Sequence, residues 1–259
     1  PQPGQTIHGG PLTTLPGGKS ANQAAAAALL GAPTAFVGAV GMDDNGDFLA
    51  ASLDACGVDT GNLHRVKVAT SCAIITVDAR AENMIVVTEG ANNQVDGEIL
   101  DAARDALTSA KAVGLALEIP IETVIAAAQM AHEAGAVVVF NPSPMPSSVP
   151  KELLVNTDVL VINEGEMRAM IGDIAGDWNL AEERLKALGV GSAVVTIGPR
   201  GAMVLDHGVT LVPVVEVEVV DTTGCGDSFT GALMAALASG RDLLAAAEFA
   251  SVVASYASM

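Results

Sequence analysis

Short apolar runs alternate with longer amphipathic segments through the second half of the chain. Apolar strands that alternate with helices build right-handed βαβ units, and the parallel sheet that they form is buried on both faces. The pattern therefore predicts a single α/β domain with a mainly parallel sheet. The predicted elements are the strand Val113–Leu117, the helix Ile121–Ala134, the strand Val137–Phe140, the short helix Lys151–Val155, the strand Val159–Ile162, the helix Leu180–Leu188, the strand Ala193–Ile197 and a helical pattern at Leu243–Tyr256.

The chain from the Ala-rich run to residue 56 follows a helix–strand–helix pattern. The alanines through Leu30 predict a helix, followed by a strand at Thr34–Gly41 and a helix at Asp47–Cys56. Gly31 and Pro33 break the apolar run, so it does not predict a membrane span. The acidic turn at residues 41–46 lacks the spacing of a metal-binding loop, and we interpret it as a solvated loop.

A second, smaller sheet is expected outside the main one. β-Branched residues predict strands at Thr70–Val77 and Asn83–Val87, joined by the polar turn Asp78–Glu82. Short stretches before Leu15, in which apolar and polar residues alternate, favour a hairpin or edge strands. The small sheet would then comprise strands at about residues 5–15 and 70–90, and a surface hairpin without function is the alternative.

The stretch from Val217 to Gly240 combines a strand pattern, a glycine turn and a helix pattern. Val217, Val219 and Val220 alternate with Glu216 and Glu218, whereas Phe229, Leu233, Ala236 and Leu237 recur at helical spacing. Between them Gly224 and Gly226 leave the backbone bare, so that amide N–H groups can converge on an anion at the start of the helix.

Asp227 falls in the first turn of this helix, beside the predicted anion site. A carboxylate there would repel a bound anion, so its position is unfavourable for anion binding alone. The position is explained if Asp227 takes a proton from a hydroxyl that attacks a phosphoryl group held by the amides. The alternative is an ordinary acidic residue at a helix N-terminus.

The residues DTTGCGDSFTGAL, which begin at Asp221, resemble the D-T-x-G-A-G-D signature of the ribokinase-like (PfkB) sugar kinases. The resemblance implies that Asp227 is the catalytic base and that Gly224, Cys225 and Gly226 form the anion hole. Cys225 stands where the family usually has Ala. A thiol at a helix N-terminus is expected to have a lowered pKa and to be oxidisable, and an inert packed cysteine is the alternative.

The residues GGKSANQA, from Gly17, precede the Ala-rich helix. A phosphate-binding P-loop would need Gly at position 13, where the chain has Thr13, and an apolar strand leading in, so that interpretation fails. The segment resembles the family's G-G-K-G-A-N-Q-A sugar-binding signature instead. A glycine turn that caps a helix is the alternative. The resemblance implies sugar contacts from Gly17, Gly18, Lys19 and Asn22.

Several predicted strands end in polar residues or glycine. Parallel strands place their carboxyl ends at one edge of a sheet, where ligands bind in α/β folds, so the series indicates a site. Asn163 and Glu166 match the family's N-x-x-E motif, which implies that Glu166 organises Mg²⁺ through water, although an Asn cap with Glu in the first turn fits equally well. The strand-end residues are Glu118, Asn141, Asn163, Thr196 and Gly198.

The resemblance assigns further ligands. It implies ATP contacts from Asn163, Thr196, Gly198, Gly201, Gly224 and Gly226, a sugar contact from Glu118, and a K⁺ site at Asp221 and Thr223. Arg200 could contact phosphate, and an exposed loop arginine is the alternative.

Composition narrows the partners. The net charge of −18 with only 12 Lys and Arg argues against nucleic acid and anionic membrane as partners. Cys56, Cys72 and Cys225 follow no disulfide or metal spacing, which indicates a reducing compartment and a cytoplasmic location.

The family resemblance as a whole implies a three-layer αβα fold with a small β lid, which often serves as a dimer surface. It implies ATP-dependent phosphorylation of the 5-hydroxyl of D-ribose with Mg²⁺ and K⁺. Alternatives are phosphorylation of fructose, ketodeoxygluconate or adenosine, or a non-catalytic relative that binds sugar or nucleotide. The family's first strand and its C-terminal strand and helix have no counterpart here, so we expect this sequence to be part of a longer chain.

Overall fold

The computed structural model describes residues 4–77 and 83–259. Its main sheet has six strands in the order β10-β9-β8-β7-β6-β5. The four strands β5 to β8 pair in parallel, whereas β9 and β10 are antiparallel additions at one edge. The strands are β5 Ala112–Ala116, β6 Val137–Asn141, β7 Val159–Asn163, β8 Ser192–Thr196, β9 Ala202–Leu205 and β10 Val209–Val212.

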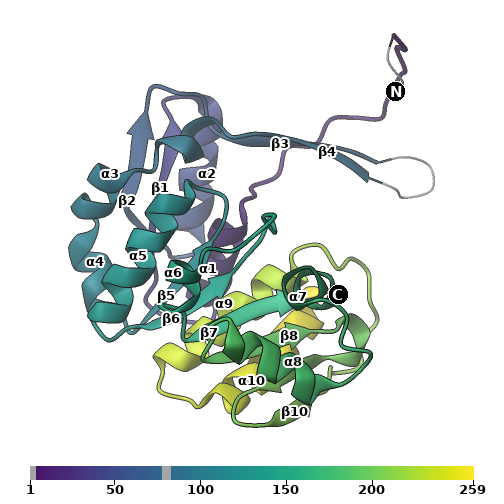
Figure 1. Cartoon of the computed structure of the whole chain (residues 1–259). Coiled ribbons are helices and arrows are strands. Elements are labelled where there is room, and N and C mark those ends of the chain that lie inside the picture. The colour runs from purple at the N-terminus through teal and green to yellow at the C-terminus, as the bar shows by residue number, and fades with distance from the viewer. Residues whose placement is uncertain (1–3, 78–82) are drawn as a thin grey trace.

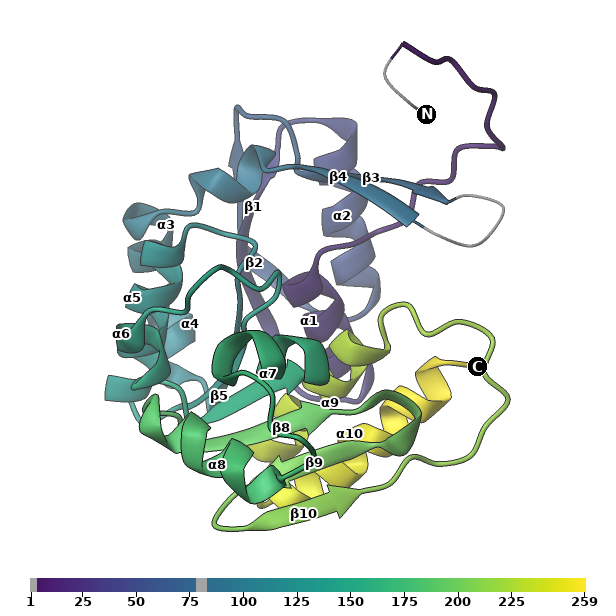
Figure 2. The same ribbon diagram turned by 45° about the vertical axis from the view of Figure 1, so that its right-hand side comes forward.

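Helices cover both faces of this sheet, which gives the predicted αβα arrangement (Figures 1 and 2). Alternate residues of one strand serve the two faces: Val138 and Phe140 of β6 lie in one core cluster and Val139 in the other. The first cluster includes residues of α5 Ile121–Glu133, α6 Lys151–Leu154, α7 Glu164–Ile171 and α8 Trp178–Ala187, and the second includes residues of α9 Cys225–Ala238 and α10 Leu243–Ala257.

The helix α1 (Lys19–Leu29) packs on α9 and β5, beside the second core cluster. Its buried face consists of small residues together with Gln23. Small side chains allow two helices to approach closely, so α1 and α9 form one compact unit. The start of α1 and the start of α9 are the two segments that the sequence marks for sugar binding and catalysis.

A two-stranded parallel sheet, β1 Ala35–Gly41 with β2 Asp59–Val66, lies beside the main body. The helix between them, α2 (Asp44–Ala55), begins three residues before the expected Asp47. Asp43 is its N-cap, so the interpretation of residues 41–46 as a solvated loop is wrong. The remaining helices are α3 Gly97–Ala102, α4 Arg104–Ser109 and the 3₁₀ turns Gly90–Gln94 and Gly198–Arg200.

The predicted hairpin is present as β3 Cys72–Val77 and β4 Asn83–Thr88, paired antiparallel. It projects from the body of the molecule (Figures 1 and 2). The predicted turn Asp78–Glu82 lies outside the described residues. Residues 5–15 contain no strand, so within the described parts of the chain the small sheet consists of β3 and β4. Ile7 and Leu12 are 56% and 92% exposed, so this segment does not bury an apolar face against the rest of the protein.

The predicted strand at Val217–Val220 is also wrong, because residues 213–219 form no strand. This segment, residues 213–221, instead runs along α10, where serines hold its backbone. Ser251 Oγ donates to the carbonyl of Pro213 at 2.7 Å, and the N–H of Val215 donates to Ser255 Oγ at 3.1 Å. The N–H of Val220 donates to the carbonyl of Ser258 at 2.8 Å. Valine and glutamate do alternate in this segment, but no strand in the described part of the chain pairs with it.

Among the described residues, no helix has the length and hydropathy needed to cross a membrane.

Candidate active site

The carboxyl ends of the parallel strands bring the strand-end residues to one edge of the sheet, as their positions in the sequence require. Asn141 ends β6, while Asn163 and Thr196 end β7 and β8 and are direct cross-strand partners. Glu118 follows β5 by two residues. A side-chain hydrogen bond joins two of these strands near this edge: Asn141 of β6 donates to the carbonyl of Val161 in β7 at 2.8 Å.

Glu118 stabilises the N-terminus of α1. The backbone N–H of Lys19, the first residue of the helix, donates to Glu118 Oε2 at 2.7 Å. The N-cap residue Gly18 has no side chain to fill this role, and its φ of 104° is one that favours glycine. A carboxylate beside a helix N-terminus is stabilised by the helix dipole. Gly17, directly before it, is exposed.

The pKa of Glu118 is raised above the ordinary glutamate value. Burial is the main cause, because it penalises the ionised form, and the nearby carboxylate of Asp227 adds to it. The backbone N–H and the charge of Lys19 act in the opposite direction. The carboxylates of Glu118 and Asp227 therefore lie close enough to influence one another, although they are far apart in the sequence.

Asp227 lies in the first turn of α9 and contacts the start of α1. Asn22 Nδ2 donates to Asp227 Oδ2 at 2.8 Å. A hydrogen bond from an amide side chain fixes the rotation of the carboxylate. The pair connects the predicted sugar-binding segment to the predicted base.

The glycine turn places main-chain groups at the start of α9. Gly224 is the N-cap and has a left-handed φ of 77°, which a side chain would strain. The first N–H groups of a helix, here those of Cys225, Gly226 and Asp227, have no acceptor within the helix. The N–H of Cys225 donates to the carbonyl of Thr222 at 3.2 Å in this structure. The turn thus brings main-chain N–H groups together at the start of α9, and the Cys225 donor is engaged locally.

The thiol of Cys225 does not have the lowered pKa expected from its position. Burial, and after it the negative charge of Asp221, raise the pKa of this thiol above its ordinary value. The expectation of an activated thiol is therefore wrong, because burial and the nearby carboxylate of Asp221 both favour the protonated thiol.

Asp221 and Thr223 form a tight local turn. The N–H of Thr223 donates to Asp221 Oδ1 at 2.8 Å. The backbone N–H and the hydroxyl of Thr223 both lower the pKa of Asp221. Asp221 is therefore an ionised carboxylate at the entrance to the glycine turn.

Asn163 and Glu166 form a reciprocal capping box at the start of α7. The N–H of Glu166 donates to Asn163 Oδ1 at 2.8 Å, and the N–H of Asn163 donates to Glu166 Oε2 at 2.9 Å. The structural alternative for this motif is therefore present. It engages one oxygen of the carboxylate. Among the described residues, no group of three His, Cys, Asp or Glu side chains is arranged as a metal cluster.

The turn after β8 is held from both sides. Gly198 has a φ of 60° and Gly201 a φ of 104°, and a Cβ on Gly201 would lie 1.9 Å from the carbonyl oxygen of Val212. Arg200 Nη2 pairs with Glu164 Oε1 at 2.6 Å, so this arginine ties the turn to α7. Thr196 Oγ1 donates to the carbonyl of Ile162 at 3.5 Å.

Sequence reasoning missed two residues that hold the site together. Gln23 is 2% exposed, and its Nε2 donates to Asn141 Oδ1 at 3.4 Å, so it links α1 to β6. Gly231 lies where α9 crosses α1: a Cβ there would be 2.3 Å from the carbonyl oxygen of Gln23 and 2.8 Å from Ala26 Cβ. A lone glutamine within an alanine run was the available signal for Gln23. No signal in the sequence marked Gly231.

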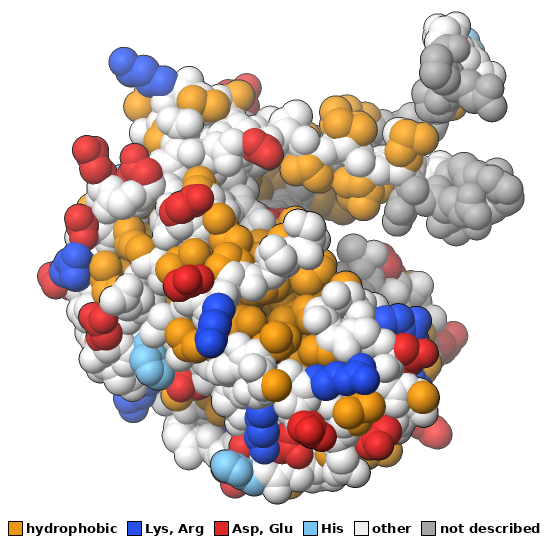
Figure 3. Space-filling view, viewed as in Figure 1, with side chains coloured by type: hydrophobic (Ala, Val, Ile, Leu, Met, Phe, Trp, Pro, Cys, Tyr) orange, Lys and Arg blue, Asp and Glu red, His pale blue; other side chains and the backbone are white. Residues whose placement is uncertain are grey.

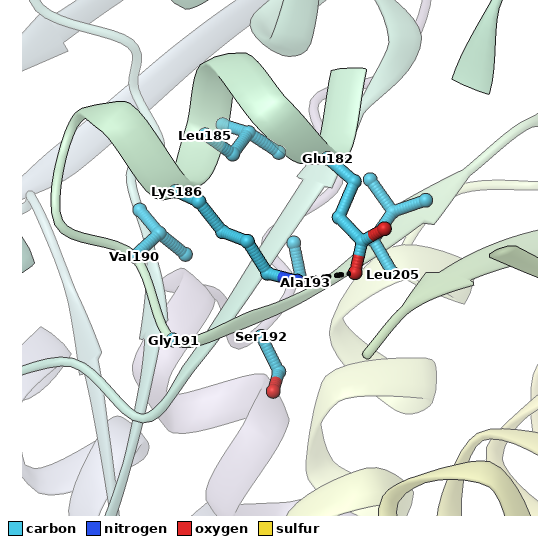
Figure 4. A pocket seen from close by; sticks show the side chains of 8 residues that line it. All are labelled: Glu182, Leu185, Lys186, Val190, Gly191, Ser192, Ala193 and Leu205. Carbon is cyan, nitrogen blue, oxygen red and sulfur yellow. Dashed lines mark hydrogen bonds and ion pairs between the residues drawn. The ribbon is translucent and has the colours of Figure 1, made fainter. Parts of the chain in front are cut away.

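A shallow depression on another part of the surface lies away from the candidate site. It lies between α8 and β8 and contains Glu182, Leu185, Lys186 and Ser192 (Figure 4). Lys186 Nζ pairs with Glu182 Oε1 at 2.7 Å, one turn apart on α8. Ser192 starts β8, so the depression faces the end of the sheet opposite the strand-end residues. It plays no part in the candidate site.

Comparison with known proteins identifies the class. The model of the pfkB family of carbohydrate kinases matches residues 2–258. The chain belongs to this family, whose members phosphorylate a sugar hydroxyl.

Within the family, several of the similar curated proteins are ribokinases. The chain is 35% identical to the ribokinase of Bacillus subtilis, with 98% of this chain and 85% of the relative covered, and 35% identical to that of Schizosaccharomyces pombe, with 96% and 83% covered. A solved structure described as Arabidopsis thaliana ribokinase complexed with ribose and ATP matches with a TM-score of 0.92 and 32% identity, covering 98% of this chain and 85% of that one. The fold is therefore the ribokinase-like fold predicted from the sequence.

Proposed function

We propose that this protein transfers the γ-phosphoryl group of ATP to the 5-hydroxyl of D-ribose, with Asp227 as the general base. The observation that carries the proposal is the placement of Asp227 beside the glycine turn, with its carboxylate held by Asn22 at 2.8 Å. Several of the similar proteins are ribokinases, and one of the similar structures is described as a complex with ribose and ATP.

Asp227 removes the proton of the attacking hydroxyl, and Asn22 holds the carboxylate in the orientation for that transfer. Main-chain N–H groups at Gly224 and Gly226 stabilise the charge that develops on the transferred group. The N–H of Cys225 joins them when it exchanges the Thr222 carbonyl for a phosphoryl oxygen. Positioning and charge stabilisation of this kind supply most of the rate in phosphoryl transfer.

The sugar binds between the start of α1 and the loop after β5. The backbone of Gly17 and Gly18, which carries no side chain, allows close approach, and Lys19, Asn22 and Glu118 provide polar contacts. Glu118 is partly buried and accepts the N–H of Lys19, so the binding segment is held in place before the sugar arrives.

ATP is proposed to bind along the carboxyl ends of β7 and β8. The contacting residues would be Asn163, Thr196, Gly198, Gly201, Gly224 and Gly226. The pairing of Asn163 with Thr196 and the ion pair of Arg200 with Glu164 support this, because they make the two loops one surface.

The acidic and amide oxygens of this region fit a hard cation. Glu166 has one carboxylate oxygen in the capping box, so contact with Mg²⁺ through water fits the donors present. Bound Mg²⁺ would neutralise charge on the phosphates. Asp221 and Thr223 are the proposed K⁺ ligands, supported by the ionised carboxylate of Asp221.

The test is a sugar panel with the Asp227→Asn variant. Wild-type protein is expected to release ADP from ATP with D-ribose in preference to 2-deoxyribose, fructose, ketodeoxygluconate and adenosine. 2-Deoxyribose is included because the chain is 31% identical to a deoxyribokinase of Salmonella typhi. Asp227→Asn should bind ATP and ribose in calorimetry but turn over about 10³-fold more slowly. Near-normal turnover of this variant would refute the assignment of the base.

A homodimer through the hairpin belongs to the same proposal. Ile74, Ile75, Ile85 and Val86 are each more than half exposed, and they occupy both faces of the two strands. Figure 3 shows the hydrophobic side chains gathered along the projecting hairpin. An isolated two-stranded hairpin is marginally stable in water, and exposed apolar patches mark interfaces. One face would close over the sugar and the other would pack on a second copy.

Light scattering tests the dimer. Ile74 pairs with Val86 and Ile75 with Ile85, so the two pairs lie on opposite faces. The Ile74→Lys/Val86→Lys and Ile75→Lys/Ile85→Lys variants should differ, with one becoming monomeric and the other mainly losing sugar affinity. A monomeric wild-type protein would contradict the dimer.

The three free cysteines are the basis for proposing a cytoplasmic location.

A further inference from the structure

The acidic turn Gly41–Gly46, which the proposed mechanism does not use, joins three elements at the root of the hairpin. Asp43 Oδ1 accepts the N–H of Gly46, at 2.9 Å, and so caps α2. The same carboxylate accepts two hydrogen bonds from Thr70, the hydroxyl at 2.5 Å to Oδ1 and the backbone N–H at 2.8 Å to Oδ2. Thr70 lies two residues before β3, in the segment that leads into the hairpin.

Thr70 is the centre of this network. It is 6% exposed, and its hydroxyl oxygen also accepts the N–H of Gly41, at the end of β1, at 2.9 Å. The carboxylate of Asp43, the hydroxyl of Thr70 and the amide of Gly41 thus form one chain of hydrogen bonds. The bonds from Thr70 lower the pKa of Asp43, so the carboxylate is ionised and its hydrogen bonds are charge-assisted.

The backbone around this network leaves no room for side chains. A Cβ on Gly41 would lie 2.6 Å from the N atom of Thr70, and a Cβ on Gly46 would lie 2.3 Å from the carbonyl oxygen of Gly41. Arg65 of β2 closes the outer side: its Nη1 lies 2.8 Å from Asp47 Oδ1 and donates to the carbonyl of Gly41 at 3.3 Å.

The strand that leaves the hairpin is held at the same place. Ala91 donates its N–H to the carbonyl of Ala69 at 2.9 Å, and Asn92 donates its N–H to Ser71 Oγ at 3.1 Å. Gly90 has a φ of 47°, and a Cβ there would lie 2.5 Å from the carbonyl oxygen of Ala69. Both ends of the hairpin are therefore fixed to one small region, to which Asp43 is attached through Thr70.

The hairpin beyond this root is exposed over its whole length in β3. Six residues of extended chain span about 20 Å, so a rotation of 10° at the root moves the tip by roughly 3 Å. A displacement of that size is enough to lose contact with a bound sugar. The direction of the hairpin is thus decided by a few hydrogen bonds at its base.

We propose that Asp43 is a positioning residue for sugar binding: its hydrogen bonds to Thr70 set the direction of the β3–β4 hairpin over the sugar site. This inference rests on the proposed lid role of the hairpin. Asp43 touches no reacting atom and acts through Thr70 and the hairpin. The N-cap of α2 and the anchor of the hairpin are two separate duties of one carboxylate.

The Asp43→Asn substitution separates these duties. The amide oxygen of the new side chain can still accept the N–H of Gly46. The amide NH₂ would face the backbone N–H of Thr70, and because both groups are donors this hydrogen bond would be lost. Thr70→Val removes the hydroxyl at nearly constant volume, and Thr70→Ser retains it. Asp96→Asn is the matched control, because Asp96 caps α3 through one oxygen, Oδ1, and has no bond to the described part of the hairpin.

The expected result is a rise of about tenfold in the KM for D-ribose in Asp43→Asn and Thr70→Val, with the KM for ATP within about twofold. Amide hydrogen exchange in β3 and β4 should become faster in both variants. Thr70→Ser and Asp96→Asn should behave like the wild type. If Asp43→Asn does not fold, the comparison of Thr70→Val with Thr70→Ser decides.

Two outcomes would overturn the proposal. The first is unchanged ribose KM and unchanged exchange in the hairpin. The second is an equal rise in both KM values with a lower melting temperature, which would indicate a role in stability alone. A wild-type protein that phosphorylates no sugar would refute the proposed function, whereas the exchange measurement would still decide whether Asp43 anchors the hairpin.

Discussion

The crossing of α1 and α9 at Gly231 allows a quantitative prediction for Gly231→Ala. The new Cβ would lie 2.3 Å from the carbonyl oxygen of Gln23, whereas ordinary contact begins at 3.4 Å, so the helices must separate by about 1 Å. Asn22 Nδ2 lies 2.8 Å from Asp227 Oδ2, and the same displacement takes this pair out of hydrogen-bond range.

The effect on stability should be modest. Alanine favours a helix by about 1 kcal/mol over glycine, and overpacking costs about 1–3 kcal/mol, so the free energy of unfolding should fall by about 2 kcal/mol or less. The effect on catalysis should be larger, because a 1 Å displacement of positioned groups can lower turnover about 100-fold. The variant is therefore expected to fold and to be nearly inactive.

The assay is ADP release with ribose and ATP at saturation, together with a thermal melt of each variant. Gly97→Ala is the control, because Gly97 lies at the start of α3 with open space around it, and its activity should not change. Ala26→Gly would remove the methyl group that lies nearest to the missing Cβ position of Gly231, without forcing the helices apart. Turnover of Gly231→Ala within about twofold of wild type, with an unchanged melting temperature, would show that the helix crossing does not set the geometry of Asp227.

Three further predictions concern the site. Burial raises the pKa of Glu118 in the folded protein. The free energy of unfolding should therefore fall as the pH rises from the ordinary glutamate pKa through the raised pKa, because the buried side chain must ionise. Glu118→Gln should flatten this part of a profile of melting temperature against pH, and it should raise the KM for ribose about tenfold. A matching pH profile in both proteins would contradict this. Gly201→Ala should lower the free energy of unfolding by about 3 kcal/mol or more in a urea titration, because its Cβ would meet Val212 at 1.9 Å, and a loss below about 1 kcal/mol would exclude that clash. Cys225→Ala should retain turnover within about twofold in the ADP assay, because residue 225 contributes only its main chain to the anion site; a tenfold loss would give the thiol a role.

The sequence was sufficient to predict the parallel strands and the helices between them. The cores of β5 to β8 are short apolar runs, and burial on both faces makes such runs recognisable. β2 was missed because its residues, DTGNLHRV, are mostly polar and partly exposed. β9 and β10 are only four residues each, too short to show a period.

The candidate site was predictable where its residues are neighbours in the chain. The segments around Asn22 and Asp227 each join a glycine turn to a helix start, which is a local pattern. The contact of Glu118 with the N-terminus of α1, and the space that Gly231 leaves for Gln23, depend on how distant elements meet. No single segment contains that information.

The segment of residues 213–221, which contains the predicted strand Val217–Val220, has a consequence for heat sensitivity. Ser251 and Ser255 on α10, and the C-cap residue Ser258, hold the chain that leads into the glycine turn. These hydrogen bonds, rather than a ladder within the sheet, restrain the approach to Asp221. Alleles with Ser255→Ala should therefore be temperature-sensitive in growth on ribose, because the anion hole loses its support at a temperature where the sheet is still intact.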